Sequence, residues 1–317
     1  MDPRLDTIAR DKGVFLRAEV LNLGYDDRSI RTKLRAGEWR RVRHGAYVPS
    51  ERWEPLSQEQ RHRILARAVL RATKAPGVLS HTTAALEYGV PVWDLPLSSV
   101  HLTRRDERSG RHEAGVRQHA GRLLPGEVVC RDGVELTSPA RTAVDVTTIT
   151  DVEHALVVVN GLLHAGLVDR VDIIAAYDSI KGWPDTLATR LVLQLADARA
   201  ASAAETRAQH LCWRAGLPAP IPQYEIRDAS GDLIAVVDLA WPEFGVYLEI
   251  DGKVKYTRYL RPGESAADAV VREKRREQRI WEATGWRVIR LVWADLYEPE
   301  KTASRIRRML SGEAWSL

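Results

Sequence analysis

Carboxylates interrupt two apolar segments in the last third of the chain. Asp238 ends the run Ile234–Val237, and Glu249 and Asp251 alternate with apolar residues in the segment VYLEIDG (246–252). An ionised carboxylate at the end of a buried strand is costly unless it is paired or bound to a metal ion. Alternate residues of a strand share a face, so we expect Glu249 and Asp251 to point the same way.

The segments around these acids predict a compact α/β domain. A helix in SAAETRAQHLCWRAG precedes a hairpin, QYEIRDASGDLIAVVDLAW, whose turn lies at 228–231. The strand VYLEIDGKVKY follows, then a basic helix, AVVREKRREQRIWEATG, and the strand WRVIRLVW. The order α-β-β-β-α-β predicts a single mixed sheet with helices packed on it.

Four acids of this region are candidate ligands of a metal ion: Glu205, Asp238, Glu249 and Asp251. Clustered carboxylates repel one another, and a cation offsets that repulsion. Oxygen ligands suit Mg²⁺ or Mn²⁺, which activate water and offset the charge of a scissile phosphate. The alternative is a set of surface ion pairs, in which Ser202 and Glu205 form a helix capping box.

Three lysines are candidates for the cation that assists such chemistry. Lys253 and Lys255 continue the alternation of Glu249 and Asp251 if the strand runs on past residue 252. Lys274 belongs to a helical stripe with apolar members that should face the sheet, formed by Val270, Lys274, Glu277 and Trp281. The other side of that helix should follow a phosphate backbone, through Arg272, Arg275, Arg276 and Arg279.

The first 50 residues predict three short helices followed by a β-hairpin, the order of a winged helix-turn-helix. Asp27 is the expected N-cap of the third helix, which Gly37 closes. Basic residues concentrate on this helix and the hairpin, where they would meet DNA phosphates: Arg28, Arg31, Lys33, Arg35, Arg40, Arg41, Arg43 and His44. The alternative is a small helical domain with solvated charges.

Residues 51–195 predict an α+β domain without a catalytic constellation. Helices are expected over 57–73, in SHTTAALEYGVP from a cap at Ser80, and over 139–168 from a cap at Ser138. Histidines in this segment show no ligand-like spacing: His81, His101, His112, His119, His154 and His164. We therefore expect a scaffold or interaction domain.

Composition excludes several classes of protein. A length of 317 residues suits about two domains, and a hydrophobic fraction of 44% suits folded ones. The 2 cysteines lie far apart, which indicates a reducing compartment. A polar N-terminus and the lack of a long apolar run predict a cytoplasmic, nucleoid-associated protein without a membrane partner.

The C-terminal region resembles the PD-(D/E)xK nuclease superfamily, in the branch of the very-short-patch-repair endonucleases. The resemblance covers about 200–297 and rests on Glu205, VVD with Asp238, LEIDG, the EKRRE helix and GWRVIRL with Trp293 and Asp295 after it. It implies Glu205, Asp238 and Glu249 as metal ligands. Asp251 stands where the superfamily usually has lysine, and the histidines that follow this strand in the repair enzymes are missing.

The first two segments resemble AbiEi-type antitoxins, which carry an N-terminal winged helix and repress their own operon. The resemblance rests on IRTKLRAGEWRRVRHGAYV, SHTTAALEYGVP and LTSPARTAVD. It implies DNA as a partner of the first domain. A cognate toxin or another protein is a further candidate partner, and the oligomeric state is left open.

Together these features predict a multi-domain α/β protein with a winged helix at 1–50, an α+β domain at 51–195 and a nuclease-like domain at 196–317. The leading hypothesis is a Mg²⁺- or Mn²⁺-dependent DNA endonuclease that the winged helix delivers to DNA. The alternative is a transcriptional repressor or antitoxin whose nuclease-like domain is weak or inactive. A pure protein-interaction scaffold is the third hypothesis.

Overall fold

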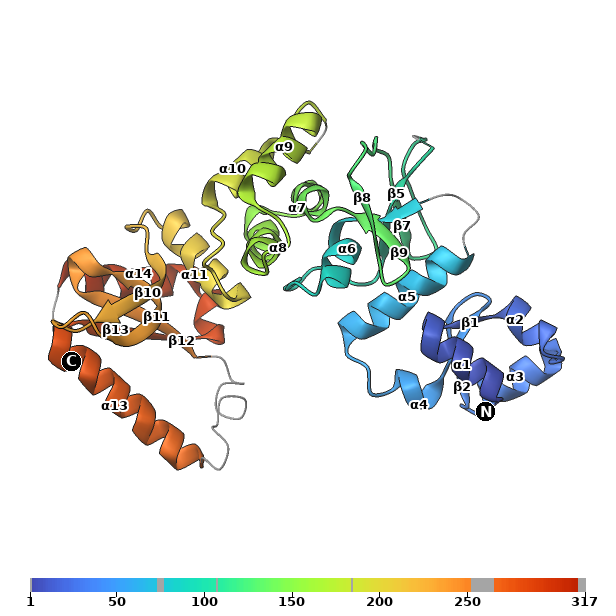
Figure 1. The fold of residues 1–317 in the computed structure, drawn as a ribbon, viewed down its shortest axis with the longest axis horizontal. Coiled ribbons are helices and arrows are strands. Elements are labelled where there is room, and N and C mark those ends of the chain that lie inside the picture. Colours follow the sequence, from blue (N-terminus) through green and yellow to red (C-terminus); the bar gives the residue numbers. More distant parts are fainter. Residues whose placement is uncertain (1, 73–76, 107, 184, 252–264, 313–317) are drawn as a thin grey trace. The chain divides into compact units, whose positions relative to one another are not determined.

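A computed structural model describes residues 2–72, 77–106, 108–183, 185–251 and 265–312. The chain is a multi-domain α/β protein that divides into two compact units (Figure 1). The first comprises Met1–Val158 with Ala165–Leu193, and the second comprises Val159–His164 with Gln194–Leu317. Each unit is described by itself below.

The first unit begins with three helices and a hairpin, in the predicted order. Its elements are α1 (Pro3–Lys12), β1 (Phe15–Leu16), α2 (Arg17–Asn22), α3 (Asp27–Arg35), β2 (Trp39–Arg43) and β3 (Ala46–Pro49). The three strands pair antiparallel in the order β1-β3-β2. Buried Phe15 and Trp39 pack edge to face, with ring centroids 4.9 Å apart, and join the strands to the helices.

The N-cap of α3 was predicted one residue too late. Asp26 caps the helix, because its carboxylate accepts the Ser29 backbone N–H at 2.7 Å. Asp27 lies in the first turn and pairs with Arg17 at 2.6 Å. Gly37 follows the helix with φ of 71°, as its expected closing role requires.

A second sheet forms the rest of the first unit. Its strands are β4 (Gly77–Leu79), β5 (Val100–Arg104), β6 (Arg111–Glu113), β7 (Val116–His119), β8 (Val128–Arg131) and β9 (Val134–Thr137). They lie in the order β6-β7-β5-β4-β9-β8, with parallel and antiparallel neighbours. The helices of this region are α4 (Ser50–Trp53), α5 (Gln58–Ala72), α6 (His81–Tyr88), α7 (Pro139–Thr147) and α9 (Arg170–Ile180). Two more helices, α8 (Val152–His164) and α10 (Leu187–Leu195), have residues in both units.

The helix predicted over 139–168 is two helices. Ser138 caps α7 as expected, since its hydroxyl accepts the Arg141 backbone N–H. The helix ends at Thr147, and Asp151 starts α8 by accepting the His154 backbone N–H at 3.1 Å. The apolar pattern appears continuous over 139–168, but Asp151 within it is an N-cap residue that marks the start of a second helix.

The second unit contains the predicted order α-β-β-β-α-β around a mixed sheet. Its elements are α11 (Ala203–Arg214), β10 (Ile221–Arg227), β11 (Leu233–Trp241), η1 (Pro242–Phe244), β12 (Val246–Asp251), α13 (Ala266–Thr284), β13 (Arg287–Val292), η2 (Trp293–Tyr297) and α14 (Pro299–Ser311). The strand order is β10-β11-β12-β13, with β12 and β13 parallel and the other neighbours antiparallel.

Helices cover both faces of this sheet (Figure 1). Leu248 packs in one buried cluster with Leu211 of α11 and Ile306 of α14. Tyr247 packs in another with Ile280 of α13. The alternation predicted for β12 is therefore confirmed: its odd-numbered residues face α13, and its even-numbered residues face α11 and α14.

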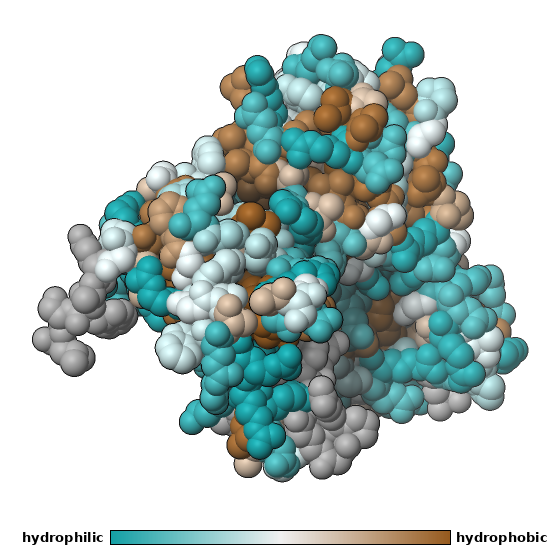
Figure 2. Space-filling view, turned by 60° about the vertical axis from the view of Figure 1, so that its left-hand side comes forward, coloured by the Kyte–Doolittle hydropathy of each residue, from teal (hydrophilic) through white to brown (hydrophobic). Residues whose placement is uncertain are grey.

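Hydrophilic side chains cover much of the face shown in Figure 2, with hydrophobic ones gathered in patches between them. None of the helices in the described part of the chain is long and apolar enough to cross a lipid bilayer.

Candidate functional site

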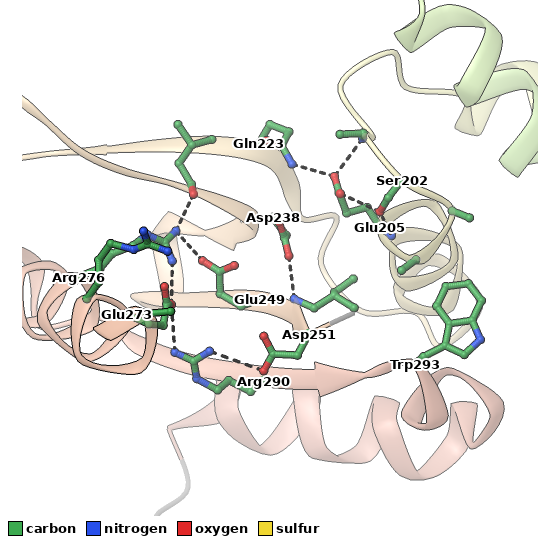
Figure 3. Close-up of a pocket in the computed structure, with 17 residues that line it drawn as sticks. Ser202, Glu205, Gln223, Asp238, Glu249, Asp251, Glu273, Arg276, Arg290 and Trp293 are labelled. Carbon is green, nitrogen blue, oxygen red and sulfur yellow. Dashed lines mark hydrogen bonds and ion pairs between the residues drawn. The ribbon is translucent and has the colours of Figure 1, made fainter. Parts of the chain in front are cut away.

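A pocket of about 730 Å³ in the second unit gathers the predicted acids. Glu205 comes from α11, Asp238 from β11, and Glu249 and Asp251 from β12 (Figure 3). The other charged or polar residues that line it are Ser202, Gln223, Arg272, Glu273, Arg276 and Arg290. The fold thus places all four acids on one cavity.

The sequence suggested that Asp238 ends its strand, but in the structure Asp238 lies inside strand β11. Three further apolar residues continue the strand to Trp241. Backbone pairing between β11 and β12 extends from Trp241↔Val246 to Leu239↔Leu248. Beyond Leu239 the side chain takes over the pairing, because Asp238 Oδ2 accepts the Ile250 backbone N–H at 2.7 Å. This hydrogen bond orients a carboxylate that lines the pocket.

Glu249 is almost completely buried and paired with an arginine. Its side chain is 7% exposed, and its Oε1 accepts from Arg276 Nη2 at 2.8 Å. Arg276 also donates to the carbonyl of Val236 at 2.7 Å and to Glu273 at 3.1 Å. Burial opposes the charge of Arg276, but Glu249 and Glu273 raise its pKa above the usual value.

Asp251 meets a second arginine, Arg290 of β13, at 3.8 Å. The same guanidinium reaches Glu273 at 3.4 Å and Glu277 at 3.2 Å. Parallel pairing sets Arg290 opposite Glu249 in register, which explains why it lies beside these carboxylates. Basic and acidic groups therefore alternate along this side of the pocket.

Glu205 lines the pocket and also contacts the residue that caps its own helix. Ser202 caps α11, since its Oγ accepts the Glu205 backbone N–H at 3.2 Å and donates to the Glu205 carboxylate at 2.8 Å, but this carboxylate accepts the backbone N–H of Ala201 at 3.0 Å in place of that of Ser202, so the expected capping box is only half formed. Gln223 Nε2 donates to the same carboxylate at 2.8 Å. Burial raises the pKa of Glu205, and the Asp238 carboxylate raises it further. The two acids thus repel each other across the pocket.

The phase of α13 differs from the prediction. Ile280 is fully buried and sets the inward face of the helix, while Trp281 is 65% exposed. Ala269, Glu273 and Arg276 precede Ile280 on this face and line the pocket, so Arg276 points inward and Lys274 outward. Arg275 is exposed as expected. Lys253, Lys255 and the side chain of Val270 lie outside the described residues.

Arg290 was missed as a site residue because its position depends on strand pairing that the sequence does not display, whereas Arg272 and Arg276 were expected on the outer side of α13 and instead line the pocket. Arg290 sits in a strand whose neighbour is known only once the sheet order is known. The i, i+3 spacing of Glu273 and Arg276 was the available signal for an acid–base pair on α13.

The N-terminal helix α3 and hairpin β2–β3 present most of the predicted basic residues to solvent. The exposed ones are Arg28, Arg31, Arg35, Arg40, Arg41 and His44. Lys33 is half-buried and pairs with Glu38 at 2.6 Å, and Arg43 is half-buried. Five arginines on two adjacent elements remain accessible to a large anionic partner.

The middle segment does contain a cluster of histidines, contrary to the prediction. His81, His101 and His119 place one ring nitrogen each within 4.8 Å of the others. His154 instead pairs with Asp151, and His164 Nδ1 donates to the carbonyl of Ala198. The spacing along the chain gave no sign of the cluster, because helix α6 and strands β5 and β7 bring its members together.

Comparison with known sequences shows that the N-terminal region is similar to a family of regulators. Residues 3–50 match the sequence model of a family described as "Transcriptional regulator, AbiEi antitoxin". The resemblance of this region to AbiEi-type regulators is thereby confirmed. Two uncharacterized proteins of Mycobacterium tuberculosis, from strains CDC 1551 and H37Rv, are each 32% identical over 175 residues, or 55% of this chain. The chain spans 61% of the length of these curated relatives.

Proposed function

We propose that the protein is a DNA-binding transcriptional regulator whose first 50 residues form a winged helix. The observation that carries this proposal is the set of exposed arginines on α3 and its hairpin, in a region that matches a family of transcriptional regulators. The order of three helices and a hairpin is that of winged helices. The family description also makes a toxin protein a second class of partner.

In this proposal α3 enters the major groove and the hairpin lies along the backbone. Arg28, Arg31 and Arg35 lie on the helix, and Arg40 and Arg41 lie on strand β2 of the hairpin. Each guanidinium that meets a phosphate releases condensed counterions, so binding should weaken steeply with salt. Lys33 and Arg43 contribute less, because the first is held by Glu38 and the second is half-buried.

Binding of the full chain to fluorescent duplexes tests this proposal. One duplex carries the DNA upstream of the chain's own gene, and the other has the same composition in shuffled order. Replacing Arg28, Arg31 and Arg41 with alanine should weaken binding to both. The matched control, with Arg170, Arg190 and Arg214 replaced, removes the same charge from exposed positions elsewhere and should bind nearly as the wild type does.

The acidic pocket supports a second candidate function, metal-dependent hydrolysis of nucleic acid. Its observation is that four carboxylates line one cavity, and that Glu205 and Asp238 repel each other across it. Carboxylate oxygens suit Mg²⁺ or Mn²⁺ and fit this cavity, with Glu205, Asp238, Glu249 and Asp251 as candidate ligands. Such an ion supplies an activated water and a positive charge for the scissile phosphate.

The chain's own residues prepare this pocket in defined ways. The Ile250 N–H orients Asp238, and Ser202 and Gln223 orient Glu205. Arg276 and Arg290 offset the negative charge of Glu249 and Asp251, with which they form ion pairs. Among the described residues, the acids do not bring three ligand atoms within 4.8 Å of one another, so an ion would have to draw them closer.

Cleavage assays on plasmid, single-stranded and mismatched DNA with Mg²⁺ or Mn²⁺ test the second function. Asp238→Asn should abolish cleavage and leave DNA affinity nearly unchanged, because it alters the pocket and spares the arginines of α3. If the wild type cleaves no substrate and still binds the DNA upstream of its gene, the hydrolytic function is refuted and the regulator proposal stands.

A further inference from the structure

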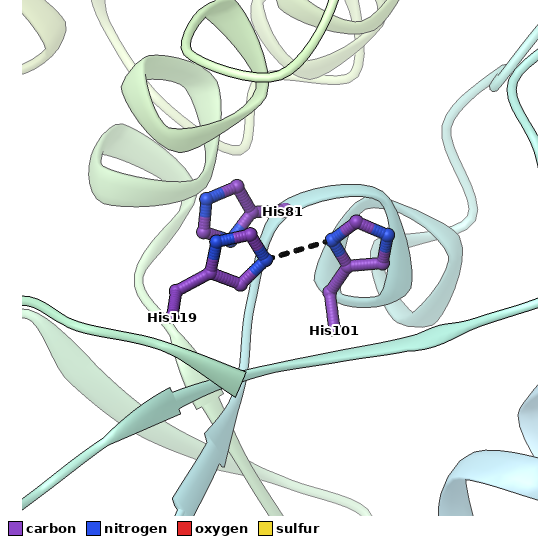
Figure 4. Close-up of side chains that lie close together, drawn as sticks. All are labelled: His81, His101 and His119. Atoms are coloured by element: carbon purple, nitrogen blue, oxygen red, sulfur yellow. Dashed lines mark hydrogen bonds between the residues drawn. The ribbon is translucent and has the colours of Figure 1, made fainter. Parts of the chain in front are cut away.

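Three histidines from three elements meet in the first unit (Figure 4). His101 belongs to β5, and His119 ends β7. The parallel register pairs His101 with Arg117 and Thr103 with His119, so the side chains of His101 and His119 emerge on the same face of the sheet. His81, the first residue of α6, completes the group.

The rings are close enough to share one ligand. His101 Nδ1 lies 2.9 Å from His119 Nε2, and the ring of His81 stacks on that of His119 with centroids 3.7 Å apart. His81 and His101 are only 4% and 6% exposed. Three imidazoles are thus held together inside the fold, where each polar nitrogen needs a partner.

The separation of the nitrogens suits a tetrahedral metal ion. Two imidazole nitrogens on a tetrahedral zinc, each about 2.05 Å from it, lie about 3.3 Å apart. The observed 2.9 Å between His101 and His119 therefore needs to open by only a few tenths of an ångström. Imidazole favours zinc and related transition metals, whereas Mg²⁺ and Ca²⁺ prefer oxygen.

The surroundings of His81 orient its ring. Its Nδ1 lies 2.8 Å from Ser80 Oγ, the kind of outer hydrogen bond that fixes the tautomer of a metal-binding histidine and leaves Nε2 for the ion. The backbone of His81 has φ of 52°, a left-handed conformation that is uncommon for residues other than glycine. Strained residues of this kind cluster at functional sites.

An adjoining cavity gives access to the cluster. A pocket of about 410 Å³ is lined by His101, and by Ser98, Ser99, His112 and Arg117 among its polar residues. An ion can approach His101 from this side. With three histidine ligands, a tetrahedral ion would have a fourth position for water or another small ligand. The positive charge of Arg117, which lines the pocket, would favour a small anion there.

We propose that His81, His101 and His119 form a binding site for a divalent transition-metal ion of the zinc class. The site is distinct from the acidic pocket, because its residues belong to the first unit and offer nitrogen atoms, not carboxylate oxygens, as ligands. It does not depend on the proposed DNA binding or hydrolysis.

Titration of the chelator-treated full chain with Co²⁺ tests the proposal. One equivalent should give the strong visible absorption of tetrahedral cobalt, and Zn²⁺ should displace it. His101→Ala and His119→Ala should each weaken Zn²⁺ binding by at least about 100-fold, more than the loss of an outer-shell partner does. His164→Ala is the matched control, and Glu249→Gln excludes a contribution of the acidic pocket; both should keep the signal.

Two results would overturn the proposal. The first is the lack of tetrahedral cobalt absorption in the wild-type chain at neutral pH. This test does not depend on whether any variant folds. The second is absorption that persists in both His101→Ala and His119→Ala. His101→Gln keeps a polar side chain of similar reach, and circular dichroism of this variant separates loss of the metal from loss of the fold.

Discussion

Replacing Arg276 with methionine should destabilise the second unit by about 2–3 kcal/mol. Breaking a buried ion pair by removing one partner costs about 3–5 kcal/mol, because the other charge stays buried. Glu249 is 7% exposed at its side chain, which favours the full cost, whereas Arg276 is 27% exposed, which reduces it. Methionine keeps much of the length and apolar contact of the arginine stem.

Hydrogen exchange of peptides from β11 and β12, measured as a function of urea, reports the unfolding of this unit alone. Adding Glu249→Gln to Arg276→Met should recover most of the lost stability, since the buried carboxylate that has lost its ion pair with Arg276 is then replaced by a neutral amide. The exposed neighbour Arg275, replaced by methionine, should change stability by less than about 0.5 kcal/mol. A loss below that value for Arg276→Met, or no recovery in the double variant, would refute this account of the pocket.

Three further predictions concern individual side chains. Trp39→Ala should destabilise the N-terminal region by about 3–5 kcal/mol in urea unfolding, because Trp39 is 4% exposed against Phe15. Gly285→Ala should cost about 1–2 kcal/mol in thermal unfolding, since the cap of α13 has φ of 66°; an unchanged melting temperature would contradict the strain argument. Burial lowers the pKa of His62, so below about pH 6.5 the unfolded chain binds more protons than the folded chain. The free energy of unfolding should therefore decrease as the pH is lowered, by at most about 1.4 kcal/mol per pH unit for this group. His62→Gln should flatten the dependence between pH 7 and 5, and equal slopes in both proteins would rule this out.

The sequence predicted most of the second unit's elements because its signals are local. The alternation of β12, the turn between β10 and β11 and the basic helix α13 are each visible within a few residues. Glu249 and Asp251 were placed on one face for the same reason. Long apolar patterns with clear turn residues between them carry this kind of information well.

The details that failed depend on tertiary context. Asp238 was taken for a strand end, because only pairing with β12 shows that the strand continues to Trp241. The phase of α13 was set by Val270 and Trp281 in the prediction and by Ile280 in the structure. The histidine cluster joins residues far apart in the chain through a parallel strand pair, for which no local pattern exists.

The dependence of DNA affinity on salt tests the central proposal most directly. Each phosphate contact contributes about 0.9 to the slope of log Kobs against log salt, so the wild type and the variant lacking Arg28, Arg31 and Arg41 should differ by about 2.7. The control variant lacking Arg170, Arg190 and Arg214 should keep the wild-type slope. Equal slopes for the wild type and the first variant would contradict the assignment of α3 and its hairpin as the DNA-binding surface.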